Sequence, residues 1–252
     1  MQMIKSKLDF KKENQIAWEQ NTDYWLHNPL RQVEDTKTFF KQKLAESIRP
    51  DMSIVDMGCG SGWLLEFLLE LNIPFSYRGL DFNKKFVDYL QEKYSNIPFA
   101  SFDYVDFEEP IEDIYHNSAD IVFNCFNFFE TANLETAFEN AAQILKPSGK
   151  LVIFTIEVTY LILAVSDSME EFKTKLKIYE DIKGKGEVPY FFQNIDMGDS
   201  ENRELKYASV LYSLDDYYKQ AKKFKMIFND YGEVVKTSKY LPKVYQYIVF
   251  KK

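Results

Sequence analysis

Residues 54–62 read Ile54-Val55-Asp56-Met57-Gly58-Cys59-Gly60-Ser61-Gly62, and this stretch is the strongest indication of the fold. A short apolar run, 53–57, ends in a turn with glycine at alternate positions, and a helical pattern over 62–71 starts directly after it. Glycine lets the backbone turn sharply and lets a ligand approach without a Cβ in the way. The first N–H groups of the new helix also lack partners within it. The stretch therefore predicts a buried strand, a ligand-binding turn and a helix, rather than a tight turn without a ligand.

The spacing of the glycines distinguishes between two kinds of nucleotide cofactor. The dinucleotide fingerprint is G-x-G-x-x-G, with the pyrophosphate bound at the start of the helix. Here Gly62 comes one residue early, and Trp63 stands where that fingerprint has its third glycine. A tryptophan there would obstruct the close packing of helix and strand, so a nicotinamide-dependent oxidoreductase is disfavoured.

An acidic residue ends the next expected strand. Asp81 follows Tyr77-Arg78-Gly79-Leu80 and comes 23 residues after Gly58. This is close to the spacing of about 20 residues found in nucleotide-binding folds. A carboxylate at that distance suits a ribose, because it can accept a hydrogen bond from each of the two hydroxyls. The alternative is an Asp that caps the following helix. The glycine turn before it favours the ribose role.

Strands and helices are expected to alternate through the middle of the chain. The strand patterns are 77–80, 99–102, 120–124 and 150–156, and the helical patterns between them are 83–94 and 134–145. This alternation implies an α/β fold, a doubly wound and mostly parallel sheet with helices on both faces. Strand patterns over 226–235 and 244–250 predict a hairpin that adds an antiparallel edge. The sheet would then have seven strands, the last of them antiparallel.

The motif Asp56-x-Gly58-x-Gly60-x-Gly62, followed by Gly79-Leu80-Asp81, resembles the class I S-adenosylmethionine-dependent methyltransferases of the small-molecule type. Three later segments agree with the resemblance, which covers roughly 51–157: 101–106, 119–124 and 142–151. In the last of them Ser148 replaces the first glycine of the family's leucine-lysine-proline-glycine-glycine run. The resemblance implies that the three motif glycines line the amino acid portion of S-adenosylmethionine, with Asp56 supporting that loop.

The resemblance also implies the contacts of the rest of the cofactor. Asp81 would bind the ribose hydroxyls, and Phe82 would lie against adenine. Asp103 would accept from the adenine amino group with Tyr104 beside it, the alternative for Asp103 being an acid on a surface loop. Asn124 would contact the cofactor's ammonium, the alternative being an amide satisfied at the end of its strand.

The first 50 residues resemble the helical cap of small-molecule methyltransferases. There Tyr24 and Arg31 could reach the cofactor, Arg31 by pairing with its carboxylate. An ordinary solvated helix face is the alternative for both residues.

These patterns divide the chain into four expected segments. They are a helical cap (1–50), a cofactor-binding Rossmann-like core (51–160), an insertion or substrate cap (161–213), and a C-terminal helix and hairpin that complete the core sheet (214–252). Outside the core, helices are expected over 14–25, 34–48, 168–179 and 214–224, and short antiparallel strands within 184–213. The insertion would cover the active site or form a dimer interface.

Methyl transfer from a sulfonium is an in-line displacement, in which alignment in a dry pocket is the protein's main task. A general base helps only where the nucleophile starts out protonated, so the sequence names no catalytic residue. After the fourth strand Asn124-Cys125-Phe126-Asn127 replaces the Asn-Pro-Pro-Tyr of some amino-methylating enzymes. A small-molecule acceptor is favoured. A peptide or protein acceptor, and a regulatory protein that binds the cofactor without turnover, are the alternatives.

Composition and charge further restrict the partners and the cellular location that are expected for the protein. The formal net charge is −8, from 39 acidic and 31 basic residues, which disfavours nucleic acid as a partner. No apolar stretch is long enough for a membrane span, and the N-terminus lacks the apolar region of a signal peptide. The only cysteines, Cys59 and Cys125, suit reduced thiols in a cytoplasmic protein and form no metal ligand set. Monomer and homodimer remain open.

Overall fold

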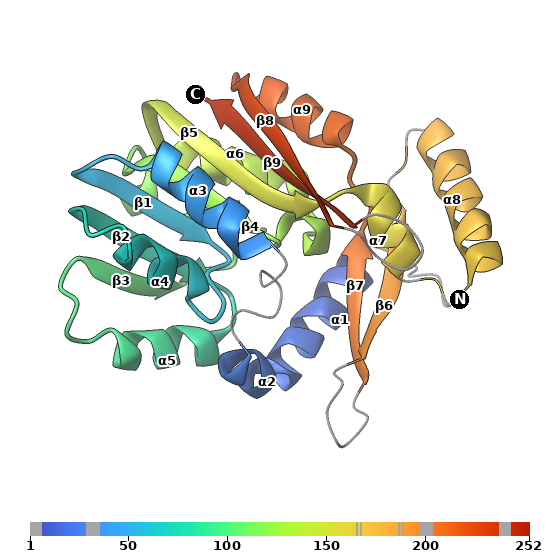
Figure 1. The fold of residues 1–252 in the computed structure, drawn as a ribbon, viewed down its shortest axis with the longest axis horizontal. Helices are drawn as coiled ribbons and strands as arrows, with labels where there is room; N and C mark the ends of the chain where they lie inside the picture. The colour runs from blue at the N-terminus through green and yellow to red at the C-terminus, as the bar shows by residue number, and fades with distance from the viewer. Residues whose placement is uncertain are drawn as a thin grey trace.

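The computed structural model describes residues 7–28, 36–164, 166, 168–185, 187, 189–196, 204–236 and 243–252. Its centre is a seven-stranded sheet in the order β3-β2-β1-β4-β5-β9-β8 (Figure 1). The first five strands are mutually parallel, and β9 is antiparallel to both of its neighbours. The strands are β1 (Met52–Met57), β2 (Phe75–Asp81), β3 (Ala100–Tyr104), β4 (Ala119–Cys125), β5 (Leu145–Ile156), β8 (Ile227–Lys236) and β9 (Lys243–Lys251).

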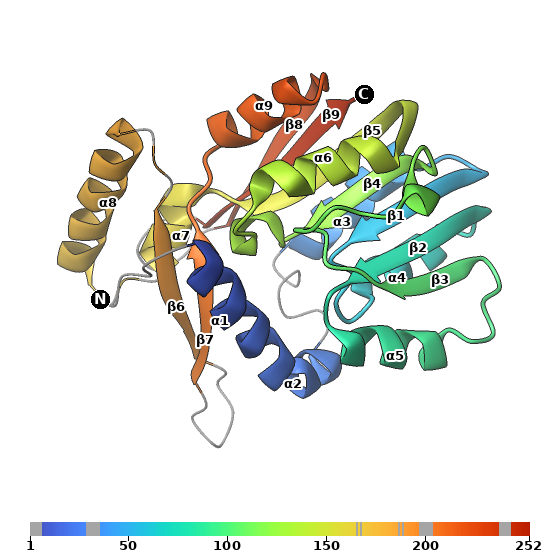
Figure 2. The ribbon, with the colours of Figure 1, turned by 180° about the vertical axis from the view of Figure 1, so that it is seen from behind.

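Helices cover both faces of the sheet because alternate residues of each strand point to opposite sides. Ile54 of β1 belongs to the core under α3 (Lys37–Ser47), α4 (Trp63–Leu69) and α5 (Lys84–Lys93). Its neighbour Val55 belongs to the core under α6 (Leu134–Ile144) and α9 (Leu214–Lys223). Figure 1 shows the first group in front of the sheet, and Figure 2 shows the second group from behind. The expected doubly wound sheet with its antiparallel last strand is confirmed.

The order of the strands reverses direction at β1. β1 pairs with β2 on one side, where Asp56 lies opposite Gly79, and with β4 on the other, where Asp56 lies opposite Phe123. The connections after β1 and β4 therefore leave to opposite sides. In open α/β sheets this reversal opens a crevice at the carboxyl ends of the strands, where ligands bind.

A smaller layer lies beyond those carboxyl ends. The helix α1 (Lys7–Gln20) packs on β7 of a separate two-stranded antiparallel sheet, β6 (Tyr190–Asp196) and β7 (Glu204–Val210), and α2 (Thr22–His27) packs on α1 and α5. Both views show α1 running along β7 below the ends of the main strands. The helices α7 (Val158–Ala164) and α8 (Met169–Gly184) join β5 to this layer. The expected helical cap and antiparallel insertion are both present, and the domain boundaries stay predictions.

Several elements differ from their expected form. The helix expected over 14–25 is two helices with a break at Asn21, where Thr22 donates its hydroxyl to the Trp18 and Glu19 carbonyls. The hairpin of β8 and β9 forms the expected edge of the sheet, with β9 between β5 and β8. β5 begins at Leu145, and α7 was not expected at all. Asn83 caps α5 and Ser213 caps α9, since each side chain accepts a backbone N–H of its helix.

None of the helices in the described part of the chain is both long enough and apolar enough to cross a membrane.

Candidate active site

The glycine turn between β1 and α4 brings the chain back toward β2. Gly58, Gly60 and Gly62 have φ values of 80°, 50° and 80°, in the left-handed region that L side chains rarely adopt. The N–H groups of Gly58 and Cys59 donate to the Leu80 carbonyl at 2.7 and 3.1 Å. The turn is thereby fixed against the end of β2.

The surroundings of the three glycines differ, and so do the constraints on them. A Cβ on Gly58 would lie 2.5 Å from the Asn127 side chain, and a Cβ on Gly62 would lie 2.6 Å from Leu90 Cδ2. A Cβ on Gly60 would meet no heavy atom within 4 Å. Gly62 therefore serves the packing of α4 against α5, whereas Gly60 faces open space.

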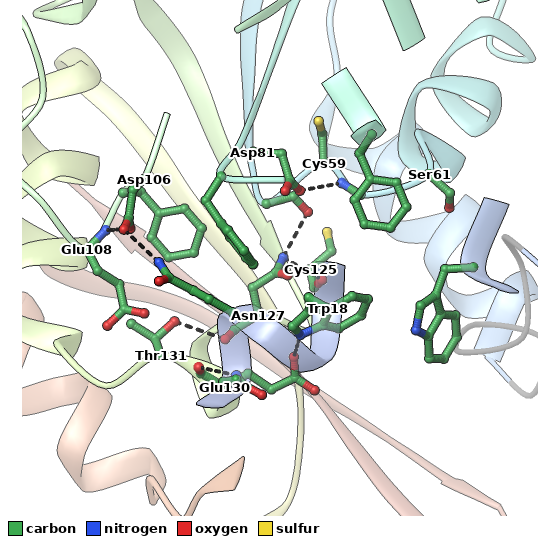
Figure 3. A pocket seen from close by; sticks show the side chains of 18 of the residues that line it. Trp18, Cys59, Ser61, Asp81, Asp106, Glu108, Cys125, Asn127, Glu130 and Thr131 are labelled. Carbon is green, nitrogen blue, oxygen red and sulfur yellow. Dashed lines mark hydrogen bonds between the residues drawn. The ribbon is translucent and has the colours of Figure 1, made fainter. Parts of the chain in front are cut away.

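That open space is part of a cavity whose empty volume, including space open to solvent, is about 810 Å³. Figure 3 shows side chains that line it. The walls come from the glycine turn, the end of β2, the loop after β3, the residues after β4, and α1 with α2. The cavity thus lies at the crevice that the strand order predicts.

Asp81 ends β2 on the wall of this cavity. Its Oδ2 accepts the N–H of Gly60 and its Oδ1 accepts the N–H of Asn83, both at 2.8 Å. A carboxylate has about four acceptor positions, so the two backbone bonds leave acceptor capacity for a ligand. Asp81 is 5% exposed, and burial raises its pKa to about 6. Phe82 follows it on the same wall.

The loop after β3 provides a different pair of residues from the one expected. Asp103 and Tyr104 do not line the cavity. The Asp103 carboxylate lies 3.5 Å from the Arg78 Nε, and Tyr104 is 65% exposed. The cavity wall is formed instead by Asp106, with Phe107 and Glu108 after it. β3 runs as far as Tyr104, and only residues beyond the strand reach the crevice. The geometry therefore favours Asp106 over Asp103 as the acceptor for adenine.

A similar shift occurs after β4. Asn124 is fully buried, where its amide donates to the Met57 carbonyl at 3.2 Å and accepts the N–H of Phe128 at 3.0 Å. It has the geometry of the satisfied strand-end amide and does not line the cavity. Asn127 lines it instead, and its Nδ2 donates to the carbonyls of Met57, Gly58 and Cys125 at 2.9–3.2 Å.

The backbone between the two asparagines explains this placement. Phe126 has a φ of 63°, which is a strained conformation for a bulky residue. The chain therefore bends at once after β4, and Asn127 turns toward the glycine loop. Strain of this kind concentrates at functional sites, where the surrounding structure holds it.

Glu130 is a cavity residue that no sequence motif indicated. It ends the short 3-10 helix η3 (Phe128–Glu130) and is 8% exposed. Trp18 of α1 donates its indole N–H to Glu130 Oε2 at 2.6 Å, and Asn14 donates its amide to the Glu130 carbonyl at 2.9 Å. Burial raises the pKa of Glu130 to about 8, against the opposing effect of the Trp18 hydrogen bond.

The N-terminal cap closes the cavity with other residues than those expected. α1 contributes Lys11 and Trp18 among others, and α2 contributes Trp25. Tyr24 does not line the cavity but packs its ring edge-on to Trp25, with centroids 5.3 Å apart. Arg31 lies outside the described residues.

Asp56 lies behind the turn rather than on the cavity wall. It accepts the hydroxyl of Tyr77 at 2.8 Å, and its Oδ1 is buried with no partner in the described part of the chain. Burial raises the pKa of this carboxyl to about 7. Its contacts fix β1 to β2, which is consistent with support of the loop.

Comparison with known proteins defines the class. Residues 55–153 match the family model described as a methyltransferase domain. This match identifies a methyltransferase domain within the chain, and the expected Rossmann-like architecture of class I methyltransferases is confirmed by the fold.

Curated relatives and solved structures are similar to the chain in different ways. A non-reducing polyketide synthase from Stachybotrys chartarum is 28% identical over 134 residues, which are 51% of this chain and 5% of that protein. The 5-methylorsellinic acid synthase of Aspergillus terreus is 29% identical over 124 residues, 48% of this chain and 5% of the synthase. The chain thus matches only a small part of each of these two synthases.

The structural likenesses concern the fold. A crystal structure of an S-adenosylmethionine-dependent methyltransferase from Methanosarcina mazei has a TM-score of 0.60 at 13% identity, covering 83% of this chain and 96% of that one. The methyltransferase (CMeT) domain of the citrinin polyketide synthase has a TM-score of 0.57 at 18% identity, covering 91% of this chain and 55% of that one.

Proposed function

We propose that this chain transfers the methyl group of S-adenosylmethionine to a small-molecule acceptor held in the cavity beside the glycine turn. The observation that carries the proposal is the pairing of Gly60 with Asp81. The carboxylate that shapes the turn keeps acceptor capacity toward the cavity, and the glycine beside it leaves the space that a Cβ would fill. A turn of this form fits a ribose and the chain attached to it.

The residues on the wall fit the other parts of the cofactor. Asp106 would accept from the adenine amino group, with Phe82 and Phe107 against the ring. The carbonyls of Gly58 and Cys125, which now accept from Asn127, would accept from an ammonium. When bound, S-adenosylmethionine would supply a methyl group attached to a positively charged sulfur. The sulfur would be the leaving group and would become a neutral thioether.

The cap supports a small acceptor over a peptide or protein. Trp18 and Trp25 of the two N-terminal helices lie on the cavity wall with the glycine turn, so an acceptor has to fit beneath them. Their rings would keep water from the methyl group, and the walls would align the acceptor with it. The net charge of −8 supports an acceptor other than nucleic acid.

Calorimetric titration with S-adenosylhomocysteine tests the proposal, with NAD titrated in parallel and Asp81→Ala as the variant. We expect micromolar binding of S-adenosylhomocysteine alone, and its loss in the variant. NAD binding, or no binding of S-adenosylhomocysteine by the folded protein, would overturn the cofactor assignment. Tight cofactor binding with no product from any small-molecule acceptor would favour a peptide acceptor or a regulatory role.

A further inference from the structure

Glu130 differs from the other carboxyl groups on the cavity wall. Asp81 accepts two backbone N–H groups, Asp106 accepts the N–H of Glu108, and Glu108 accepts the N–H of Asn133 at 2.7 Å. The carboxylate of Glu130 accepts no backbone N–H in the described part of the chain, and the Trp18 indole is its one donor there. Its Oε1 is therefore left for a ligand, although the residue is more than nine-tenths buried.

The position of Glu130 separates it from the residues that fit the cofactor. It follows β4 and faces α1, whereas the ribose and adenine positions belong to the turn, β2 and the loop after β3. Figure 3 shows Glu130 beneath Trp18, with Asn127 between it and Asp81. Glu130 thus lies on the part of the wall that the cofactor assignment leaves for the acceptor.

The charges on the wall restrict what the acceptor can be. Lys11 is the only cationic side chain among the described residues that line the cavity. Its Nζ lies 2.9 Å from Asp106 and 2.5 Å from Glu109, so both carboxylates neutralise it. Neither histidine of the chain lines the cavity. Among the described residues of the wall, an acceptor with a carboxylate or phosphate would find no uncommitted cation, whereas a cation would find acidic groups.

We propose that the acceptor is an amine, and that Glu130 binds its nitrogen and takes a proton from it during methyl transfer. This inference rests on the proposed function. An amine arrives as an ammonium and pairs with the Glu130 carboxylate. An N–H proton moves to Glu130 Oε1, and the freed lone pair forms the N–CH₃ bond. The S–CH₃ bond breaks, its electron pair stays on the neutral sulfur, and Glu130 later releases the proton to water.

The environment of Glu130 suits this exchange. Burial raises its pKa to about 8, so the carboxylate is a stronger base than an exposed glutamate and still ionises near neutral pH. β7, which also packs on η3, adds only Ser209 and Val210 among its side chains that the structure describes. Among the described residues, the titratable groups that share the cavity with Glu130 are Lys11, Cys59, Asp81, Asp106, Glu108 and Cys125.

A binding experiment tests the acceptor class without knowledge of the natural substrate. The protein is saturated with S-adenosylhomocysteine and titrated with benzylamine, benzyl alcohol and benzoate, which share a ring and differ in the group presented. We expect benzylamine to bind at least about tenfold more tightly than the other two, because a charge-assisted hydrogen bond contributes roughly 1.5–3 kcal/mol. Equal or tighter binding of the alcohol or of benzoate would overturn the proposal.

Variants assign the preference to Glu130. Glu130→Gln keeps an oxygen for the Trp18 indole but is no base, and it should abolish the preference for benzylamine while binding S-adenosylhomocysteine as the wild type does. Glu135→Gln, which removes an exposed partner of Lys223, is the matched control and should keep the preference. A preference that persists in Glu130→Gln overturns the proposal, whereas a wild type that binds no S-adenosylhomocysteine overturns the proposed function instead.

A further variant separates proton exchange from simple packing. Trp18→Phe removes the indole donor and keeps Glu130. The pKa of Glu130 should then rise, because the Trp18 hydrogen bond lowers it. The pH at which benzylamine binding is half-maximal should then move upward by a measurable amount. An unchanged pH profile would contradict the role of Glu130 as the group that exchanges the proton.

Discussion

Alanine substitutions at Gly60 and Gly62 should separate ligand binding from packing within one turn. Both residues have left-handed backbones, at φ values of 50° and 80°, and alanine there costs about 1–2 kcal/mol. Gly60→Ala should lose only this amount, because its Cβ meets nothing within 4 Å. Gly62→Ala adds a contact of 2.6 Å with Leu90, which is fully buried. Overpacking of a core costs about 1–3 kcal/mol more, so the total is about 2–5 kcal/mol.

For the binding of S-adenosylhomocysteine, Gly60→Ala should have the larger effect of the two variants. The added methyl group of Gly60→Ala would occupy the space proposed for the cofactor and should weaken S-adenosylhomocysteine by about tenfold or more, which corresponds to 1.4 kcal/mol. Folded Gly62→Ala should bind it as the wild type does, because Gly62 does not line the cavity. Urea unfolding followed by tryptophan fluorescence gives the stabilities, and calorimetry gives the affinities. Wild-type affinity in Gly60→Ala, or equal destabilisation of the two variants, would refute this reasoning.

Three other outcomes follow from the site. Asp106→Asn should weaken S-adenosylhomocysteine about tenfold in a calorimetric titration while Asp103→Asn leaves it unchanged, since only Asp106 lines the cavity; the reverse result would restore the sequence-based assignment. Asn127→Ala should lower the free energy of unfolding by about 1–3 kcal/mol in urea, because the carbonyls of Gly58 and Cys125 lose the Asn127 donor and the Met57 carbonyl keeps only Asn124 as a side-chain donor, and unchanged stability would argue against those bonds. The pKa of Glu130 is about 8 in the folded protein and about 4.3 in the unfolded chain. The free energy of unfolding of the wild type should therefore fall as the pH rises from the lower to the higher of these values. Glu130→Gln lacks this slope, so its melting temperature relative to the wild type should rise from pH 5 to pH 9, and a constant difference would contradict the buried environment.

The strands, the glycine turn and Asp81 could be predicted from the sequence because each is a local pattern. An apolar run, alternate glycines and an acid at the end of the next strand lie within one βαβ unit. The antiparallel last strand followed from its hairpin with the strand before it. Its place between β5 and β8 depends on long-range pairing, which no local pattern encodes.

The residues that line the cavity differ from those expected because of small differences in position at the ends of strands. Asp103 and Asp106 are equally acidic, and only the length of β3 decides which of them reaches the crevice. The left-handed bend at Phe126 places Asn127, rather than Asn124, beside the glycine loop. Glu130 belongs to no motif, and its burial arises from α1, which is distant in sequence.

The position of β9 inside the main sheet has a consequence for folding in the cell. Leu151, Val152, Ile153 and Phe154 of β5 pair along one whole side with β9, and β9 is made only after α7, α8, the β6–β7 hairpin, α9 and β8. Until it pairs, a nascent chain exposes an apolar strand edge of the kind that templates aggregation. Substitutions that weaken the pairing of β9 with β5 should therefore lower the yield of folded protein on expression.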